Sequence, residues 1–140
     1  MTSSSSRRSA LFVTVVLASA SIGAAEQPGE EWQVTSKMSM AGMPGDMPAQ
    51  SSTVCAARNS KEPPGAANDE RGCKNSDMRK TGNKVTFTST CAGPPAMTGK
   101  GEITFDGTDA YTGTIEYVTA RGPMTIKLSG KKLGGCDKPR

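Results

Sequence analysis

The chain has 140 residues, of which 34% are hydrophobic, 4% aromatic and 21% charged, and its formal net charge is +4. It contains no histidine, which excludes Ser-His-Asp and Cys-His catalysis and the usual histidine-containing zinc sites. The charges are scattered and stacking aromatics are few, so the composition argues against a nucleic-acid-binding protein.

The first 25 residues have the pattern of a cleavable secretory signal peptide. Arg7 and Arg8 precede an uncharged stretch at residues 9–25, and Gly23 and Ala25 fit a small-residue cleavage site. A retained membrane anchor is the alternative, but its apolar centre is short against the ~20 residues of a spanning helix. No later segment is long and apolar enough to cross a bilayer.

Cleavage would leave residues 26–140 as one small domain in the periplasm or outside the cell. Fifteen basic and 13 acidic residues remain in it, a net charge of +2. All four cysteines lie in this part, and an even number in an exported chain predicts two disulfides. The cysteines are Cys55, Cys73, Cys91 and Cys136.

Three pairings of four cysteines are open, and we favour Cys55–Cys73 with Cys91–Cys136. The first pair would close a loop with almost no apolar residues, worth about 3 kcal/mol in the chain-entropy model. The second would tie the C-terminus to a core strand. No C-x-x-C motif is present, which argues against a redox centre or a zinc knuckle.

The first two predicted strands flank a segment rich in methionine, glycine and proline. Residues 32–40 alternate with period two, with Trp32 and Val34 on the same face as Met38 and Met40. Residues 43–46 (MPGD) suit a type II turn. Residues 50–55 then form a returning strand, and residues 56–72 form a polar loop.

The rest of the chain predicts a regular antiparallel meander. Alternating segments are separated by short turns, and no amphipathic helix is apparent. We therefore expect an all-β fold, a single antiparallel meander sheet curled as an open barrel or small sandwich and stapled by two disulfides. The expected strands are 73–80, which is weak, 84–91, 97–106, 110–118 and 124–129.

Three segments of the sequence together resemble a known family. They are PGEEWQVTSKMSMAGMPGDMPAQSSTVC, GNKVTFTSTCAGPPAMTGKGEITFDGTDAYTGTIEYV and MTIKLSGKKLGGC. Their arrangement is similar to that of the small exported bacterial proteins grouped as domain of unknown function 3617. The resemblance covers almost all of residues 26–140 and implies an exported all-β protein, without an activity.

The sequence does not predict an enzyme. The carboxylates nearest to a pair are Asp106 and Asp109, with Glu102 and Glu116 on neighbouring strands. A glycosidase needs two carboxylates facing each other across a cleft, whereas Asp106 and Asp109 flank a turn glycine and suit turn chemistry. The threonines of the outer face are normal strand formers. A hydrolase that uses these carboxylates is therefore the least favoured of the three functions that we consider.

The four clustered methionines are the main candidate site. Met38 and Met40 belong to the predicted core face, where methionine fills irregular space. Met43 and Met47 lie in the loop, and strand alternation does not explain them. They could cap the sheet, or form with Trp32 a surface for an apolar ligand or envelope protein, although core packing is the first expectation for Trp32.

We therefore expect an exported, non-catalytic binding or envelope-associated module that uses no cofactor. The alternative is a periplasmic protein that binds Cu(I) or Ag(I), because thioethers are soft ligands. The ligands would be Met38, Met40, Met43 and Met47.

Overall fold

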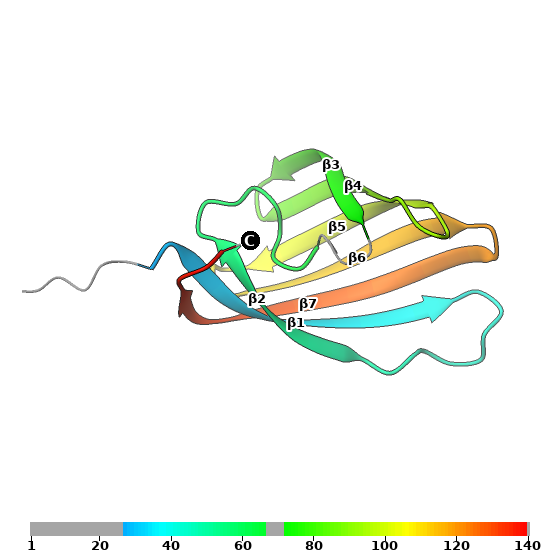
Figure 1. Ribbon diagram of the computed structural model, residues 1–140, viewed down its shortest axis with the longest axis horizontal. Helices are drawn as coiled ribbons and strands as arrows, with labels where there is room; N and C mark the ends of the chain where they lie inside the picture. Colours follow the sequence, from blue (N-terminus) through cyan, green and yellow to red (C-terminus); the bar gives the residue numbers. More distant parts are fainter. Residues whose placement is uncertain (1–26, 67–71, 140) are drawn as a thin grey trace, which may run out of the picture.

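The computed structural model describes residues 27–66 and 72–139, so the predicted signal peptide lies outside the described residues. The described residues form seven strands (Figure 1). Within the described ranges, no helix is long and apolar enough to cross a membrane. The strands are β1 (Gly29–Met40), β2 (Gln50–Ala57), β3 (Cys73–Thr81), β4 (Lys84–Cys91), β5 (Met97–Asp106), β6 (Ala110–Thr119) and β7 (Gly122–Cys136).

All seven strands pair antiparallel in one curved sheet with the order β2-β1-β7-β6-β5-β4-β3. Strands β3 to β7 form a meander, and the β1–β2 hairpin joins it through β1 and β7. The sheet is not closed, so β2 and β3 are its edges. The prediction of an all-β fold with a single antiparallel sheet is confirmed.

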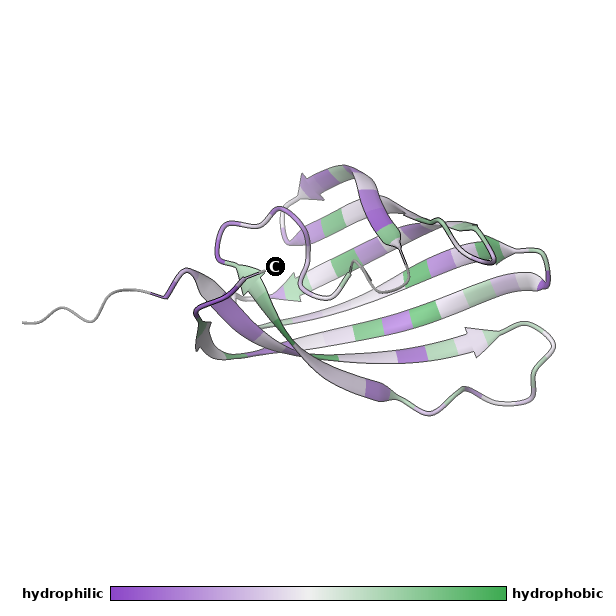
Figure 2. Cartoon of the chain, in the orientation of Figure 1, coloured by the Kyte–Doolittle hydropathy of each residue, from purple (hydrophilic) through white to green (hydrophobic). Residues whose placement is uncertain are grey.

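The sheet has one apolar and one polar face, because hydrophobic and hydrophilic residues alternate along its strands (Figure 2). The inner face carries the core, while the threonines of the outer face are exposed or half-buried. The buried hydrophobic residues are Trp32, Val34, Ala66, Cys73, Val85, Phe87, Cys91, Ile103, Tyr111, Ile115, Tyr117, Met124 and Leu128.

Four strand glycines make room for large side chains on the inner face. A Cβ added at any of them would collide with the side chain of its direct cross-strand partner. Large neighbours therefore lie flat over the glycines, and a thin layer of side chains covers the sheet. The pairs are Gly99 with Tyr117, Gly101 with Phe87, Gly113 with Ile103, and Gly130 with Tyr111.

Residues 58–66, which follow β2, cover part of the inner face (Figure 1). We expected a polar loop that burial could not order. Pro63 and Ala66 are nevertheless buried, and the Tyr111 hydroxyl donates a hydrogen bond to the Pro64 carbonyl. A Cβ at Gly65 would lie 2.9 Å from both methyl groups of Val34, so this segment packs directly on the core.

The expected disulfide pairing is wrong. The bonds join Cys55 to Cys136 and Cys73 to Cys91. Cys73 and Cys91 are directly opposite each other in the β3–β4 hairpin. In the segment that we expected a disulfide to close, residues 58–66 are held by the buried side chains of Pro63 and Ala66 instead.

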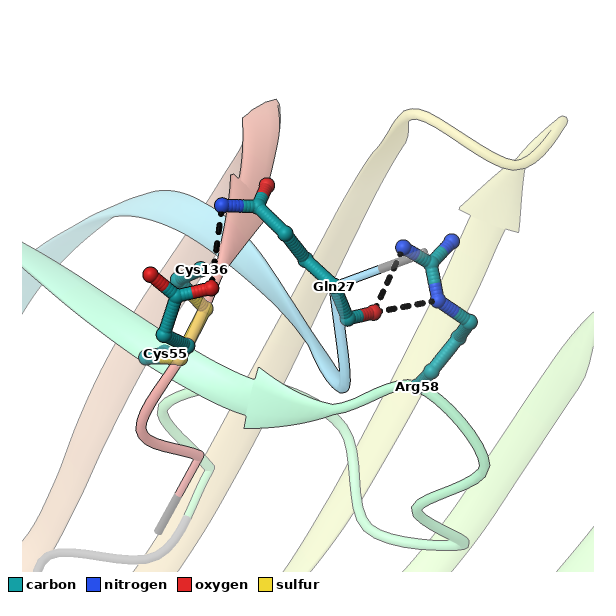
Figure 3. The surroundings of a disulfide bond; sticks show 5 residues. Gln27, Cys55, Arg58 and Cys136 are labelled. Carbon is teal, nitrogen blue, oxygen red and sulfur yellow. Dashed lines mark hydrogen bonds between the residues drawn. A yellow bond between two sulfur atoms is a disulfide. The ribbon is translucent and has the colours of Figure 1, made fainter. Parts of the chain in front are cut away.

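The Cys55–Cys136 bond connects β2 to β7 across the start of β1 (Figure 3). A Cβ at Gly29 would lie 2.9 Å from each sulfur, so only glycine fits beneath the bond. Beside it, the Gln27 carbonyl accepts hydrogen bonds from Nε and Nη2 of Arg58 at 3.2 and 3.0 Å. The bond therefore fixes an edge strand to the body of the sheet.

Candidate binding surface at the methionine-rich end of the sheet

The predicted methionine segment lies at one end of the sheet, where β1 ends and β7 begins. Met40 is directly opposite Met124, and Met38 is opposite Ile126. The chain then leaves β1, and the backbone N–H of Ala41 donates a 3.1 Å hydrogen bond to the carbonyl of Pro123. Two strands and the loop at residues 41–49 therefore meet here.

The methionines at this end differ in exposure. Met38 and Met40 are half-buried and pack against the core, which agrees with the face predicted for them. Met43 and Met47 lie in the loop and are 54% and 45% exposed. We call the four residues, together with Met124, the methionine end.

Met124 is a member that the sequence analysis did not assign to the site. It is 5% exposed, and its Cβ is within ~5 Å of that of Met40 because the two are cross-strand partners. Alternation along β7 places Met124 on the inner face. The long-range pairing of β1 with β7, which brings it beside Met40, had no local signal.

The loop that carries the exposed methionines is fixed to β1. The backbone N–H of Met47 donates a 2.9 Å hydrogen bond to the Met38 carbonyl, and that of Met43 donates a 3.3 Å bond to the Met40 carbonyl. Lys37 Nζ lies 2.7 Å from Asp46 Oδ2. This hydrogen bond and the charge of Lys37 lower the pKa of Asp46, so the pair persists near neutral pH.

Trp32, the third residue of the expected ligand surface, lies in the core and not at the methionine end. It is 3% exposed, and its ring centroid is 5.7 Å from that of Tyr111. Lys132 Nζ lies 5.3 Å from the Trp32 centroid and 3.1 Å from Glu30 Oε1. Burial raises the pKa of Tyr111 far above its ordinary value, so this tyrosine stays neutral and donates a hydrogen bond.

The carboxylates considered for catalysis occupy ordinary structural positions. Asp106 ends β5 and Asp109 lies in the following turn, where its Oδ1 is 3.5 Å from Lys132 Nζ. Glu102 pairs with Lys84 at 2.8 Å. In the part of the chain that the structure describes, no group of three or more His, Cys, Asp or Glu side chains is placed to hold a metal ion.

The geometry allows two kinds of chemistry at the methionine end. Thioether side chains are flexible and polarizable, so they adapt to apolar surfaces of different shapes. They are also soft ligands for monovalent copper or silver. Both uses draw on the same side chains, and they differ in whether sulfur itself is needed.

Comparison with known proteins matches the chain to a family. No curated protein and no solved structure matches the chain. The family model described as "Protein of unknown function (DUF3617)" matches residues 26–136, nearly all of the part described here, and confirms the resemblance drawn from the sequence. The chain therefore belongs to the DUF3617 family.

Proposed function

We propose that the protein is an exported, non-catalytic binding module whose methionine end holds an amphipathic segment of another envelope protein. The observation that carries this proposal is the exposure of Met43 and Met47 on a loop that hydrogen bonds fix to β1. Large apolar side chains held at a surface indicate a contact that covers them. Two disulfides and the N-terminal sequence pattern support export.

The free energy needed for binding requires more contact area than Met43 and Met47 provide. Fully burying a methionine is worth about 1.5–3 kcal/mol, so covering two half-exposed ones gives roughly 2 kcal/mol. A micromolar complex needs about 8 kcal/mol. The partner must therefore also cover Met38, Met40 and Ile126, which are half-buried beside the loop.

A second candidate function is the binding of Cu(I) or Ag(I). The Met40–Met124 pair favours it, because a thioether from β7 lies beside those from β1. Two inner sulfurs and one from the loop would give a three-sulfur site of the soft type.

Methyl NMR of the protein recovered from the periplasm tests both functions. The carbon-13-labelled ε-methyl groups of methionine are followed while decyl maltoside, below its micelle concentration, serves as the apolar probe. We expect the signals of Met43 and Met47 to shift first and that of Met78 on β3 to stay unchanged. Equal shifts at Met78, or no shift at any methionine, contradict the proposal that the methionine end binds apolar ligands. Silver nitrate is the probe for the metal.

Two double variants separate the candidates. Met43→Leu/Met47→Leu keeps the apolar surface and removes the sulfurs, so it retains decyl maltoside binding and loses a loop-dependent silver site. Met43→Ser/Met47→Ser loses both. The control Met78→Ser/Leu133→Ser removes two exposed apolar side chains elsewhere and keeps both. Silver shifts that the leucine variant and the serine variant both lose, and that the control keeps, establish the metal function.

A further inference from the structure

The two edges of the sheet differ in how they are protected from pairing with another strand. An exposed edge offers unpaired backbone groups, and natural proteins block it with charges and bulges. Edge strand β3 carries both kinds of protection. Its register shifts between Ser76 and Arg79, and Asp77 has a φ of 53°. Its charged residues are Lys74, Asp77, Arg79 and Lys80.

Edge strand β2 carries neither. Its sequence, QSSTVCAA, has no charged residue and no proline. Its register with β1 is continuous from Gly29–Ala57 to Ser36–Gln50. Residues 50–53 are exposed, and among the described strands none lies on the outer side of β2. Regular, uncharged strand backbone of this kind is a template for pairing.

The structure also holds β2 in a fixed position. The Cys55–Cys136 bond ties it to β7 (Figure 3), and Thr35 and Ser51 share a 2.8 Å hydrogen bond between their hydroxyl groups. An edge fixed in this way loses little conformational freedom when a further strand adds to it.

We propose that β2 pairs antiparallel with β2 of a second copy of the protein, which joins two sheets into one across a two-fold axis. The partner this edge needs is another uncharged, regular edge, and the protein itself supplies one. Such a contact is isologous, so it closes at the dimer. Its hydrogen bonds come from the backbone of β2 and not from the methionine end.

The charges that flank β2 are compatible with this pairing. Antiparallel strands bring the start of one β2 beside the end of the other. Asp46, before β2, is neutralised by Lys37 at 2.7 Å, and Arg58, after β2, lies 3.5 Å from Glu30. No like charges are directly opposite within the strand, where they would destabilise the pair.

Sedimentation velocity over a range of concentrations tests the dimer. We expect the native protein to dimerise, and Ser52→Lys/Thr53→Lys to weaken dimerisation at least about tenfold by placing lysines of the two copies next to one another. The control Thr90→Lys/Thr112→Lys adds the same charge to exposed outer-face positions of β4 and β6 and leaves the dimer intact. Amide hydrogen exchange in residues 50–56 slows as the native protein is concentrated.

Two results overturn the proposal. One is a native protein that stays monomeric up to about 1 mM, the range of the weakest specific complexes. The other is a dimer that Ser52→Lys/Thr53→Lys and Thr90→Lys/Thr112→Lys weaken equally, because its contact then lies elsewhere. Circular dichroism confirms that both variants are folded before they are compared.

Discussion

The ring of Phe87 on β4 lies in the space that a side chain at Gly101 on β5 would occupy. This relationship recurs at three further glycines, so the inner face depends on the absence of side chains as much as on their presence. The first prediction follows from it.

Gly101→Ala should lower the free energy of unfolding by about 1–3 kcal/mol, because the added methyl group displaces the buried Phe87 ring. Urea denaturation measures the change. Gly134→Ala is the matched control, since a Cβ there has no neighbour within 4 Å. The control should be neutral or slightly stabilising. Equal destabilisation of the two variants would mean that Phe87 moves aside at little cost.

The buried hydroxyl pair of Ser89 and Tyr117 gives the second prediction. Their oxygens are 2.8 Å apart, and Ser89 is completely buried. Tyr117→Phe should cost about 1–3 kcal/mol, since it leaves the serine hydroxyl without this partner. Once Ser89 is replaced by alanine, Tyr117→Phe should cost less than it does in the native protein. A thermodynamic cycle from denaturant curves measures this coupling, and strictly additive effects would contradict it.

The third prediction concerns the two disulfides. Cys55 and Cys136 are 81 residues apart, whereas Cys73 and Cys91 are 18 apart. In the chain-entropy model, the disulfide that closes the longer loop stabilises the folded state by about 4.5 kcal/mol, and the one that closes the shorter loop by about 3 kcal/mol. Replacing each pair by serine should therefore destabilise the protein more when Cys55 and Cys136 are removed. Denaturant curves of the two double variants give the order, and non-reducing peptide mapping checks the connectivity.

The fourth prediction is that Asp46 titrates below its ordinary pKa of 3.8. A lowered pKa in the folded state means that the interaction with Lys37 is fully present above the unfolded value. It is lost as the pH falls through the folded value. Carboxyl chemical shifts should show this low pKa, and Lys37→Gln should return it toward 3.8. An unchanged pKa in Lys37→Gln would mean that Lys37 is not the cause.

Strand positions could be predicted from the sequence because alternation is a local signal. The segments at residues 84–91, 97–106 and 110–118 agree with β4, β5 and β6 within one residue. The ends of other strands were predicted less accurately. Strand β7 runs to Cys136 instead of ending at residue 129, since its glycine-rich second half pairs with β1 in a way that alternation does not encode.

The disulfide pairing was predicted wrongly although a signal for it existed. A tight hairpin turn at Gly82 and Asn83 brings Cys73 to within one residue of facing Cys91, and the register shift between Ser76 and Arg79 then places the two cysteines directly opposite each other. Loop closure favours the other pairing only if residues 56–72 have nothing to bury. Pro63 and Ala66, buried against a distant part of the chain, could not be recognised locally.

The position of the methionine loop was predicted, but the position of Met124 beside Met40 was not. Alternation placed Met38 and Met40 inward and left Met43 and Met47 in the loop, as the structure has them. Met124 comes from a strand more than 80 residues further along the chain, and only the pairing of β1 with β7 brings it beside Met40.

The pairing of the first strand with the last also dictates an order of assembly. Strand β1 has β2 on one side and β7 on the other, so the N-terminal hairpin cannot join the sheet until the final strand is present. Contacts between such distant segments form slowly, because a long stretch of chain must first be ordered. During synthesis from the N-terminus, β1 and β2 would therefore remain unpaired with the rest of the sheet until β7 is complete. The Cys55–Cys136 bond could form only after that step, because Cys136 is the last residue of β7.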